Sequence, residues 1–172
     1  GGSTTTKMFN YYNNKPYAVA SDGDYQIFVI RKDLWDSPKE KAAFKAKYGY
    51  ALQPPKTWDQ QADMAEFFHR PDDNLLGATD LRSPAWGWIN FVHRYTSTGA
   101  PVQYYWDNNM KPLINGPGGV KALNHMIKTT KFGSKDALSW VWPEQYQNWG
   151  DGGAAMTIAF TNLTKFQKKG GP

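Results

Sequence analysis

The chain has 172 residues, enough for one domain with a substantial core or for one lobe of a larger protein. It contains no cysteine, which excludes disulfides and thiolate metal sites. Its three histidines, at positions 69, 93 and 125, form no close ligand pair, so we expect no bound metal and no cofactor. The net charge of +5 raises the possibility of a nucleic-acid partner. However, the lysines are scattered or lie together on one predicted exposed helix, which favours a solvated surface.

The aromatic content is the unusual feature of the composition. Eight tryptophans, ten tyrosines and nine phenylalanines exceed what a core of this size normally uses, and aromatic faces suit flat, partly apolar ligands. No apolar run is long enough to cross a bilayer, and no signal peptide is present in this sequence. The ends, "GGSTTTK" and "KKGGP", have linker-like compositions. We therefore assign residues 1–16 to a linker or crossover segment and 167–172 to a tail or linker.

The first half of the chain alternates between extended and helical segments. Residues 17–22 and 25–31 predict two extended segments around Gly23. Ser37 and Pro38 begin a helix that ends at Gly49. A capping box formed by Thr57 and Gln60 begins the next helix. The residues that this helix is predicted to bury are Trp58, Ala62, Ala65 and either Phe68 or His69.

A buried strand over residues 74–79 leads into the second half. A hairpin-like excursion over 100–116, turning at 107–109, precedes a helix over 118–131. The residues that this helix is predicted to turn inward are Val120, Leu123, Met126 and Ile127. A short helix over 143–150 and a strand over 154–160, buried on both faces, follow, and a last helix begins near 161. Alternating strands and helices predict a layered α/β domain.

Two tryptophans stand two residues apart in "LRSPAWGWINFVHRY", where Ser83 can cap a helix and Pro84 suits its first position. At about 100° per residue, Trp86 and Trp88 point to nearly opposite sides. Trp88 belongs to an apolar stripe with Phe91, Val92 and Tyr95, so we expect it in the core. Trp86 lies off that stripe and is free to contact either another helix or a ligand.

Three motifs occur in a recognisable order: "YAVASDGDYQIFVIRKDLW", "YGYALQPPKTWDQQADMAEFF" and "NWGDGGAAMTIAF". Together they resemble the extracellular solute-binding proteins of carbohydrate ABC importers, the maltose-binding-protein-like group. The resemblance covers residues 17–166 and implies one lobe of a periplasmic-binding-protein-like fold, in which two α/β lobes close over a sugar or polyol. It also implies three further features: a second lobe, the membrane subunits of an importer as partners, and a periplasmic or extracellular, lipid-anchored location.

The resemblance also implies ligand-binding positions. Trp86 becomes a stacking platform, and Asp24 aligns with a position that contacts the sugar. Asp22 is a second carboxylate on that segment, although an Asp beside Gly also favours a turn. Ser83 and Arg82 stand at the cleft-facing helix start, where Arg82 can equally be a surface cation. The remaining candidates are Thr161, Asn162 and Trp142.

The role of two of these candidates is open to a second interpretation. Asn162 departs from the tryptophan that the family commonly has there. Trp142 can supply the missing ring or can belong to the core.

Two other classes of function agree less well with the sequence. A carbohydrate-active enzyme needs two carboxyl groups across the scissile bond, but Asp22 and Asp24 share one short segment and no acidic residue is evidently placed opposite them. We therefore expect no catalytic residues. A module for single-stranded nucleic acid needs aromatic residues within a basic groove, and the two residue types are not interleaved here. A non-catalytic carbohydrate-binding lobe remains the prediction.

Overall fold

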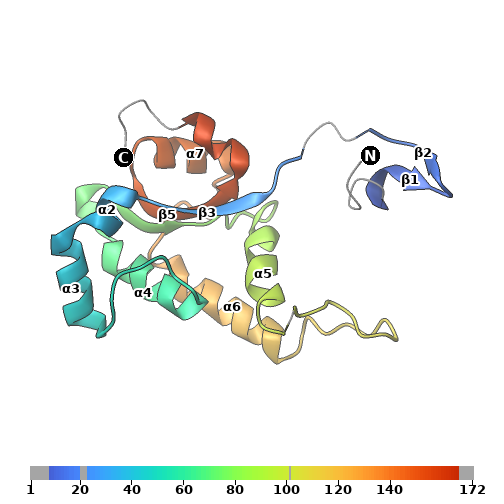
Figure 1. Ribbon diagram of the computed structural model, residues 1–172, viewed down its shortest axis with the longest axis horizontal. Helices are drawn as coiled ribbons and strands as arrows, with labels where there is room; N and C mark the ends of the chain where they lie inside the picture. The colour runs from blue at the N-terminus through green and yellow to red at the C-terminus, as the bar shows by residue number, and fades with distance from the viewer. Residues whose placement is uncertain (1–7, 20–22, 101, 167–172) are drawn as a thin grey trace.

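A computed structural model describes residues 8–19, 23–100 and 102–166, and its centre is a three-stranded sheet (Figure 1). The strands, in spatial order, are β3 (Gln26–Ile30), β5 (Ala154–Phe160) and β4 (Leu76–Thr79). β3 runs antiparallel to β5, and β4 runs parallel to it. The start of β3 and the last residues of β4 and β5 therefore lie at the same end of the sheet, which we call the carboxyl end.

Helices cover both faces of this sheet. In Figure 1, α7 lies above the sheet, whereas α4 and α6 lie below it. The helices are α2 (Lys32–Asp36), α3 (Pro38–Tyr48), α4 (Trp58–Phe68), α5 (Gly87–Thr96), α6 (Pro117–Thr130) and α7 (Trp142–Gly150), with 3₁₀ turns η1 (Pro71–Asp73) and η2 (Thr161–Phe166). A small hairpin, β1 (Tyr11–Tyr12) and β2 (Lys15–Pro16), stands apart from this body (Figure 1). The predicted layered α/β architecture is thus confirmed.

Local sequence signals determine the ends of two helices. The Ser37 hydroxyl accepts a bond from the Glu40 N–H at the start of α3 (3.3 Å), and Gly49 ends the helix with a φ of 78°. The Thr57 hydroxyl likewise accepts from the Gln60 N–H at the start of α4 (3.2 Å). The Gln60 side chain accepts from the N–H of Lys56 (2.8 Å) and not from that of Thr57. The capping box is therefore displaced by one residue.

The core has two parts, one on each side of β5. Below the sheet, aromatic and aliphatic side chains of α2, α3 and α4 pack against β4 and β5 around Phe44, Phe68 and Met156. Above it, Tyr146 of α7 packs with Ala159 and Leu163. β5 is therefore buried on both faces, as predicted.

The predicted hairpin-like excursion is confirmed, because Trp106 and Pro112 form an antiparallel bridge around a turn in which the Met110 N–H donates to the Asp107 carbonyl (3.0 Å). Two other predictions about the elements are wrong. Residues 17–19, the described part of the predicted extended segment 17–22, form no strand. α6 buries Gly119, Ala122, His125 and Thr129 instead of its apolar stripe. Val120, Leu123 and Ile127 are exposed by 55%, 52% and 64%. The reason is that α6 approaches α4 and α5 through small and polar side chains, which leaves the branched residues on its outer side.

No helix in the described ranges is both long enough and apolar enough to span a membrane.

Candidate functional site

The carboxyl end of the sheet brings together residues that are distant in sequence. Asp24 comes just before β3, and Thr161 comes just after β5. The Thr161 hydroxyl donates to a carboxylate oxygen of Asp24 (Oγ1 to Oδ1, 2.5 Å), and the Thr161 N–H donates to the Tyr25 carbonyl (3.1 Å). Two of the predicted ligand residues are thus in direct contact, 137 positions apart. Their contact follows from the antiparallel pairing of β3 and β5.

Trp86 lies near this pair because it ends the connection that follows β4. Its ring is half-buried and meets the Phe160 ring nearly edge-on, at 6.0 Å between centroids. Trp86 is the N-cap of α5, with non-helical angles of φ −126° and ψ −19°. The spacing of 100° per residue therefore does not apply to it. Trp88, which we predicted in the core, is 61% exposed, so that prediction is wrong.

Trp142 lies at the start of α7, which hydrogen bonds attach to the ends of β4 and β5. It is the first residue of α7, is 40% exposed, and its ring lies 5.6 Å from that of Tyr146. Burial raises the pKa of the Tyr146 hydroxyl, and the nearby carboxylate of Asp24 raises it further. The ring beside Trp142 therefore lies within electrostatic range of the Asp24 carboxylate.

The neighbouring buried Gln145 fixes α7 on the sheet. Its amide nitrogen donates to the Thr79 carbonyl (3.0 Å), the Thr157 hydroxyl (2.8 Å) and the Ile158 carbonyl (2.9 Å). These three bonds tie the start of α7 to the ends of β4 and β5. Trp142 is therefore held in place by a buried polar contact that the sequence pattern does not indicate.

Ser83 and Asn162 are polar and enclosed. The Ser83 carbonyl accepts from the N–H groups of Trp86 (3.0 Å) and Gly87 (2.7 Å), so it supports a turn ahead of α5 instead of capping the helix directly. Among the described residues, Ser83 Oγ and Asn162 Oδ1 are buried and have no hydrogen-bond partner. Both atoms retain unused hydrogen-bonding capacity beside the cluster.

Arg82 is not part of the cluster. Its guanidinium donates to the Met126 carbonyl, to the Thr130 hydroxyl (2.9 Å) and to the Thr129 hydroxyl (2.8 Å), all on the last turns of α6. It also pairs with Asp80 (3.3 Å). The structure thus uses Arg82 to attach the 80–86 connection to α6. Asp22, the other predicted carboxylate, lies outside the described residues.

A buried ionic network positions the connection that carries Trp86. Arg94 is 1% exposed, pairs with Asp80, donates to the Asn90 carbonyl (2.8 Å) and lies 4.5 Å from the Trp58 ring centroid. The Asn90 side chain donates to the Leu81 carbonyl (3.0 Å). Burial raises the pKa of Asp80, but the guanidinium groups of Arg94 and Arg82 outweigh it and hold that pKa below its usual value. Both ends of α5 and the connection before it are therefore fixed together.

His125 of α6 completes this network. It accepts from Arg94 Nε at Nδ1 (2.8 Å), and its Nε2 lies 2.6 Å from the Trp58 carbonyl. Burial and the charge of Arg94 lower its pKa to about 4. The ring is therefore neutral at pH 7, with its proton on Nε2. The sequence does not indicate the contact between His125 and Arg94, because neither residue spacing nor hydropathy relates side chains on two different helices.

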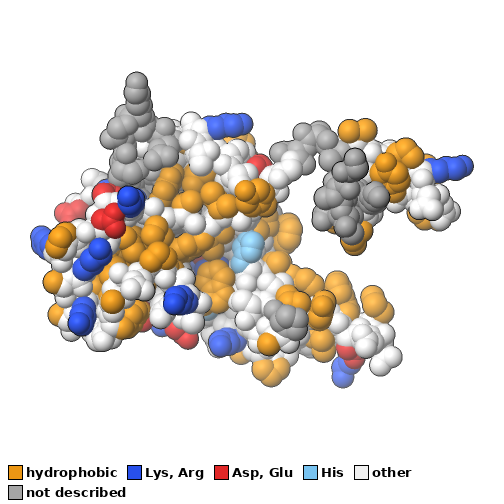
Figure 2. All heavy atoms as spheres, in the orientation of Figure 1, with side chains coloured by type: hydrophobic (Ala, Val, Ile, Leu, Met, Phe, Trp, Pro, Cys, Tyr) orange, Lys and Arg blue, Asp and Glu red, His pale blue; other side chains and the backbone are white. Residues whose placement is uncertain are grey.

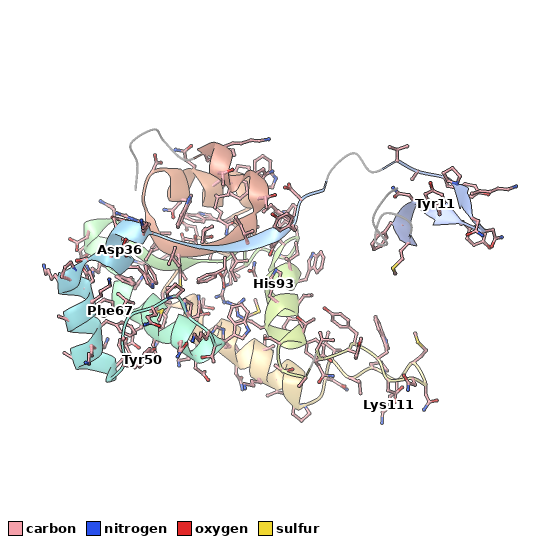
Figure 3. All side chains as sticks on the ribbon, viewed as in Figure 1. Tyr11, Asp36, Tyr50, Phe67, His93 and Lys111 are labelled. Carbon is pink, nitrogen blue, oxygen red and sulfur yellow. The ribbon has the colours of Figure 1, made fainter. Side chains whose placement is uncertain are left out.

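A separate cavity of about 1230 Å³ lies below β3, between α4, α5 and α6. None of the predicted ligand residues lines it. His93, on α5 below β3 in Figure 3, contacts the Gln26 side chain at its margin. Within the described ranges, no group of three histidine or acidic side chains is arranged to hold a metal ion.

Comparison with protein families matches the whole chain, residues 1–172, to a family described as bacterial extracellular solute-binding protein. Among curated proteins, no match is found.

Solved structures of such proteins resemble the chain in fold. An ABC transporter solute-binding protein from Agrobacterium vitis S4 with bound D-mannitol is 22% identical, with a TM-score of 0.65, over 83% of this chain and 32% of that one. Maltose-bound MalE3 of T. maritima is 22% identical, with a TM-score of 0.67, over 94% of this chain and 38% of that one. An ABC transporter solute-binding protein from Agrobacterium radiobacter K84 in complex with ribitol is 19% identical, with a TM-score of 0.63, over 85% of this chain and 34% of that one. The chain thus spans about one third of the length of these structures, which corresponds to about one lobe.

The match over the full sequence agrees with the order of the three motifs and with the layered α/β fold. It also agrees with the expectation of a binding protein in place of an enzyme. The chain therefore belongs to the bacterial extracellular solute-binding proteins, a family of non-catalytic receptors.

Proposed function

We propose that the chain is one lobe of a receptor that binds a sugar or polyol for uptake by an ABC importer. The observation that carries the proposal is the convergence of Asp24, Thr161, Trp86 and Trp142 at the carboxyl end of the sheet. Family membership supports it, and so do the sugars and polyols bound by structures of similar fold.

The cluster has the chemistry that carbohydrate recognition needs. A carboxylate makes strong, charge-assisted hydrogen bonds to hydroxyl groups, and Asp24 is exposed while its carboxylate is oriented by Thr161. Trp86 and Trp142 offer aromatic faces for the apolar side of a sugar ring. Ser83 and Asn162 supply polar atoms beside them. Asp22 stays in the proposed set because it shares a segment with Asp24, whereas Arg82 is left out because its guanidinium is engaged with α6.

In the proposed mechanism, the ligand bridges this lobe and a second one. Closure around the ligand selects a shape that the membrane subunits of the importer recognise. Residues 17–166 form the lobe, 1–16 the crossover or linker and 167–172 a tail or linker. The proposed location is periplasmic, or extracellular with a lipid anchor.

A thermal-shift screen with maltose, mannitol and ribitol tests the proposal, followed by titration of the variant Asp24→Asn. We expect at least one ligand to raise the melting temperature, and Asp24→Asn to reduce its affinity without lowering the melting temperature of the free chain. Asp36→Asn is the control, because Asp36 lies at the opposite end of the sheet (Figure 3). If the ligand binds the Asp24→Asn and Asp36→Asn variants with equal affinity, Asp24 is not part of the binding site.

A further inference from the structure

The helix α5 has an unusual distribution of polar and apolar side chains. It buries Asn90 and Arg94, each 1% exposed, and leaves Trp88 61% exposed. Phe91, one turn after Trp88 on the same side of the helix, is half-buried. Figure 2 shows hydrophobic side chains gathered over α5 and along the 100–116 segment. An exposed apolar surface beside buried polar residues is a feature that binding sites present.

A chain of ring contacts continues this aromatic surface from α5 onto the 100–116 segment. The buried Tyr95 ring stacks on that of Phe91 (5.8 Å between centroids) and on that of Tyr105 (5.3 Å). The Tyr105 ring in turn lies 5.6 Å from that of Trp106, which is 51% exposed. These contacts define a surface that we call the aromatic flank, made of Trp88, Phe91, Tyr105 and Trp106.

Hydrogen bonds fix the geometry of the flank. The Trp88 indole donates from Nε1 to the Ala85 carbonyl (3.1 Å), so this exposed ring has a defined position. The Tyr95 hydroxyl donates to the Tyr104 carbonyl (2.8 Å) and thereby attaches the 100–116 segment to α5. Aromatic rings held in this way lose little conformational entropy when a ligand packs against them. The flank is therefore a preorganised surface.

The flank is also uncharged. Over residues 83–106 the sequence carries a single Asp, Glu, Lys or Arg, which is Arg94. That residue is 1% exposed and is paired with Asp80. A nucleic acid needs cationic side chains along the surface that it contacts. Rigid, uncharged aromatic faces instead suit an uncharged ligand with apolar ring faces, such as a sugar.

The flank adjoins the proposed sugar site. The carbonyl that holds Trp88 belongs to Ala85, the residue before Trp86 in the connection that enters α5. Trp86 thus stands at one end of the flank and Trp106 at the other. At about 1.5 Å of rise per residue, α5 carries the flank over about 10 Å, from Trp88 to Tyr95. One sugar ring covers one aromatic side chain, so a ligand that contacts both ends contains several sugar rings.

We infer that the aromatic flank binds the chain of an oligosaccharide whose terminal sugar occupies the proposed site. This inference rests on the proposed function and specifies its ligand class, an oligosaccharide in place of a monosaccharide or a free polyol. Trp88 and Trp106 provide stacking faces for successive sugar rings, outside the cluster that contains Asp24 and Trp86. Affinity therefore increases with the length of the sugar chain.

Calorimetric titration with oligosaccharides of increasing length tests the inference. Each series contains a monosaccharide and its linear di-, tetra- and hexasaccharide, and the series are α-1,4-linked glucose, β-1,4-linked glucose, β-1,4-linked mannose and β-1,4-linked xylose. We expect the 172-residue chain to bind the hexasaccharide of at least one series at least tenfold more tightly than the corresponding monosaccharide. Equal affinity for all lengths in every series, or no binding of any hexasaccharide, would overturn the inference.

Substitutions on the flank locate this gain in affinity. Trp88→Ala and Trp106→Ala should each reduce the ratio of hexasaccharide to monosaccharide affinity at least threefold, and the double variant should bring the ratio close to one. Trp88→Tyr should retain most of the ratio, because it keeps an aromatic face. Tyr11→Ala is the matched control, since Tyr11 is 46% exposed on the hairpin that stands apart from the body (Figure 3).

Circular dichroism melts establish that each of these variants is folded. The ratio of affinities, unlike the affinity itself, does not change when a variant only lowers the folded fraction. A ratio that persists in the double variant, or that falls equally in Tyr11→Ala, would contradict the inference.

The variant Asp24→Asn separates the flank from the proposed sugar site. It should weaken binding of the monosaccharide and of the hexasaccharide by similar factors and leave their ratio unchanged. If Asp24→Asn changes neither affinity while Trp88→Ala and Trp106→Ala still lower the ratio, the proposed site is wrong and the oligosaccharide class is supported. If Asp24→Asn weakens binding but the flank variants leave the ratio unchanged, the inference is wrong and the proposed function stands.

Discussion

Arg94 shows how one buried side chain positions the connection that carries Trp86. It holds Asp80, at the start of the connection to Trp86, and reaches α6 through His125. A buried charge of this kind is tolerated because its partner and further hydrogen bonds compensate for lost hydration. The position of Trp86 thus depends on buried residues outside the proposed ligand site.

His125 makes the stability of this network depend on pH. Its pKa is about 4 in the folded chain, compared with an ordinary value of 6.5. The unfolded chain therefore takes up the proton first, and the free energy of unfolding falls as pH decreases from 6.5 towards 4. We expect this group to contribute a loss of about 2–3 kcal/mol, measured by urea unfolding at pH 7, 5.5 and 4.

The variant His125→Gln isolates that contribution from those of nearby carboxylates. Its side-chain oxygen can accept from Arg94 and its nitrogen can donate to the Trp58 carbonyl, but it does not titrate. The pH dependence of His125→Gln should be smaller between pH 6.5 and 4. An unchanged dependence would assign the acid sensitivity to other groups, such as Asp80.

Trp86 and Trp88 should respond differently to truncation. Trp86→Ala loses the edge contact with Phe160 and should cost about 1–2 kcal/mol of stability, with weaker ligand binding. Trp88→Ala removes an exposed ring and should change stability by less than about 0.5 kcal/mol. Denaturant melts of both variants compare the two. A loss of about 3–5 kcal/mol for Trp88→Ala would indicate a core residue after all.

At the scale of elements, α6 illustrates that the most apolar face of a helix is not always the buried one. Its inner side carries Gly119, Ala122, His125 and Thr129. A β-carbon on Gly119 would stand 1.7 Å from the Ile114 carbonyl oxygen, so the chain packs too closely there for any side chain. Small residues occupy this side because α6 packs closely against its neighbours. His125 is buried there because it hydrogen-bonds with Arg94 and the Trp58 carbonyl.

This orientation of α6 predicts opposite outcomes for two lysine substitutions. Ile127→Lys, at a position that is 64% exposed, should change stability by less than about 0.5 kcal/mol. Ala122→Lys, at a position that is 2% exposed, should unfold the chain or cost more than about 3 kcal/mol, because it buries a charge without a partner. Thermal melts of both variants decide the orientation. Greater damage from Ile127→Lys would reverse it.

At the scale of the whole molecule, the chain has its own two-part core but carries the proposed contacts of one lobe. We expect it to melt cooperatively by itself. A site of micromolar affinity corresponds to about 8 kcal/mol, and half of those contacts leaves an affinity near millimolar. Calorimetric titration of the isolated chain with the ligand from the thermal screen measures this. Low-micromolar affinity would mean that the site is complete within these residues.

The amino-acid sequence by itself determined the features that depend on neighbouring residues. Ser37, Gly49 and Thr57 define the ends of α3 and α4 through caps that involve three or four positions. Residues 154–160 are mostly small and apolar, and this local composition predicted that β5 is buried on both faces. The three motifs then indicated the family, and the match over the whole chain confirms it.

Only the tertiary structure decided which faces are buried and which predicted site residues meet. Hydropathy patterns assign burial to apolar residues, but the inner face of α5 carries Asn90 and Arg94, whose side-chain nitrogens donate to the Leu81 carbonyl and to His125. The pairing of β3 with β5 joins Asp24 to Thr161, while hydrogen bonds attach Arg82 to α6. Such contacts depend on how distant segments pack, and no local pattern contains that information.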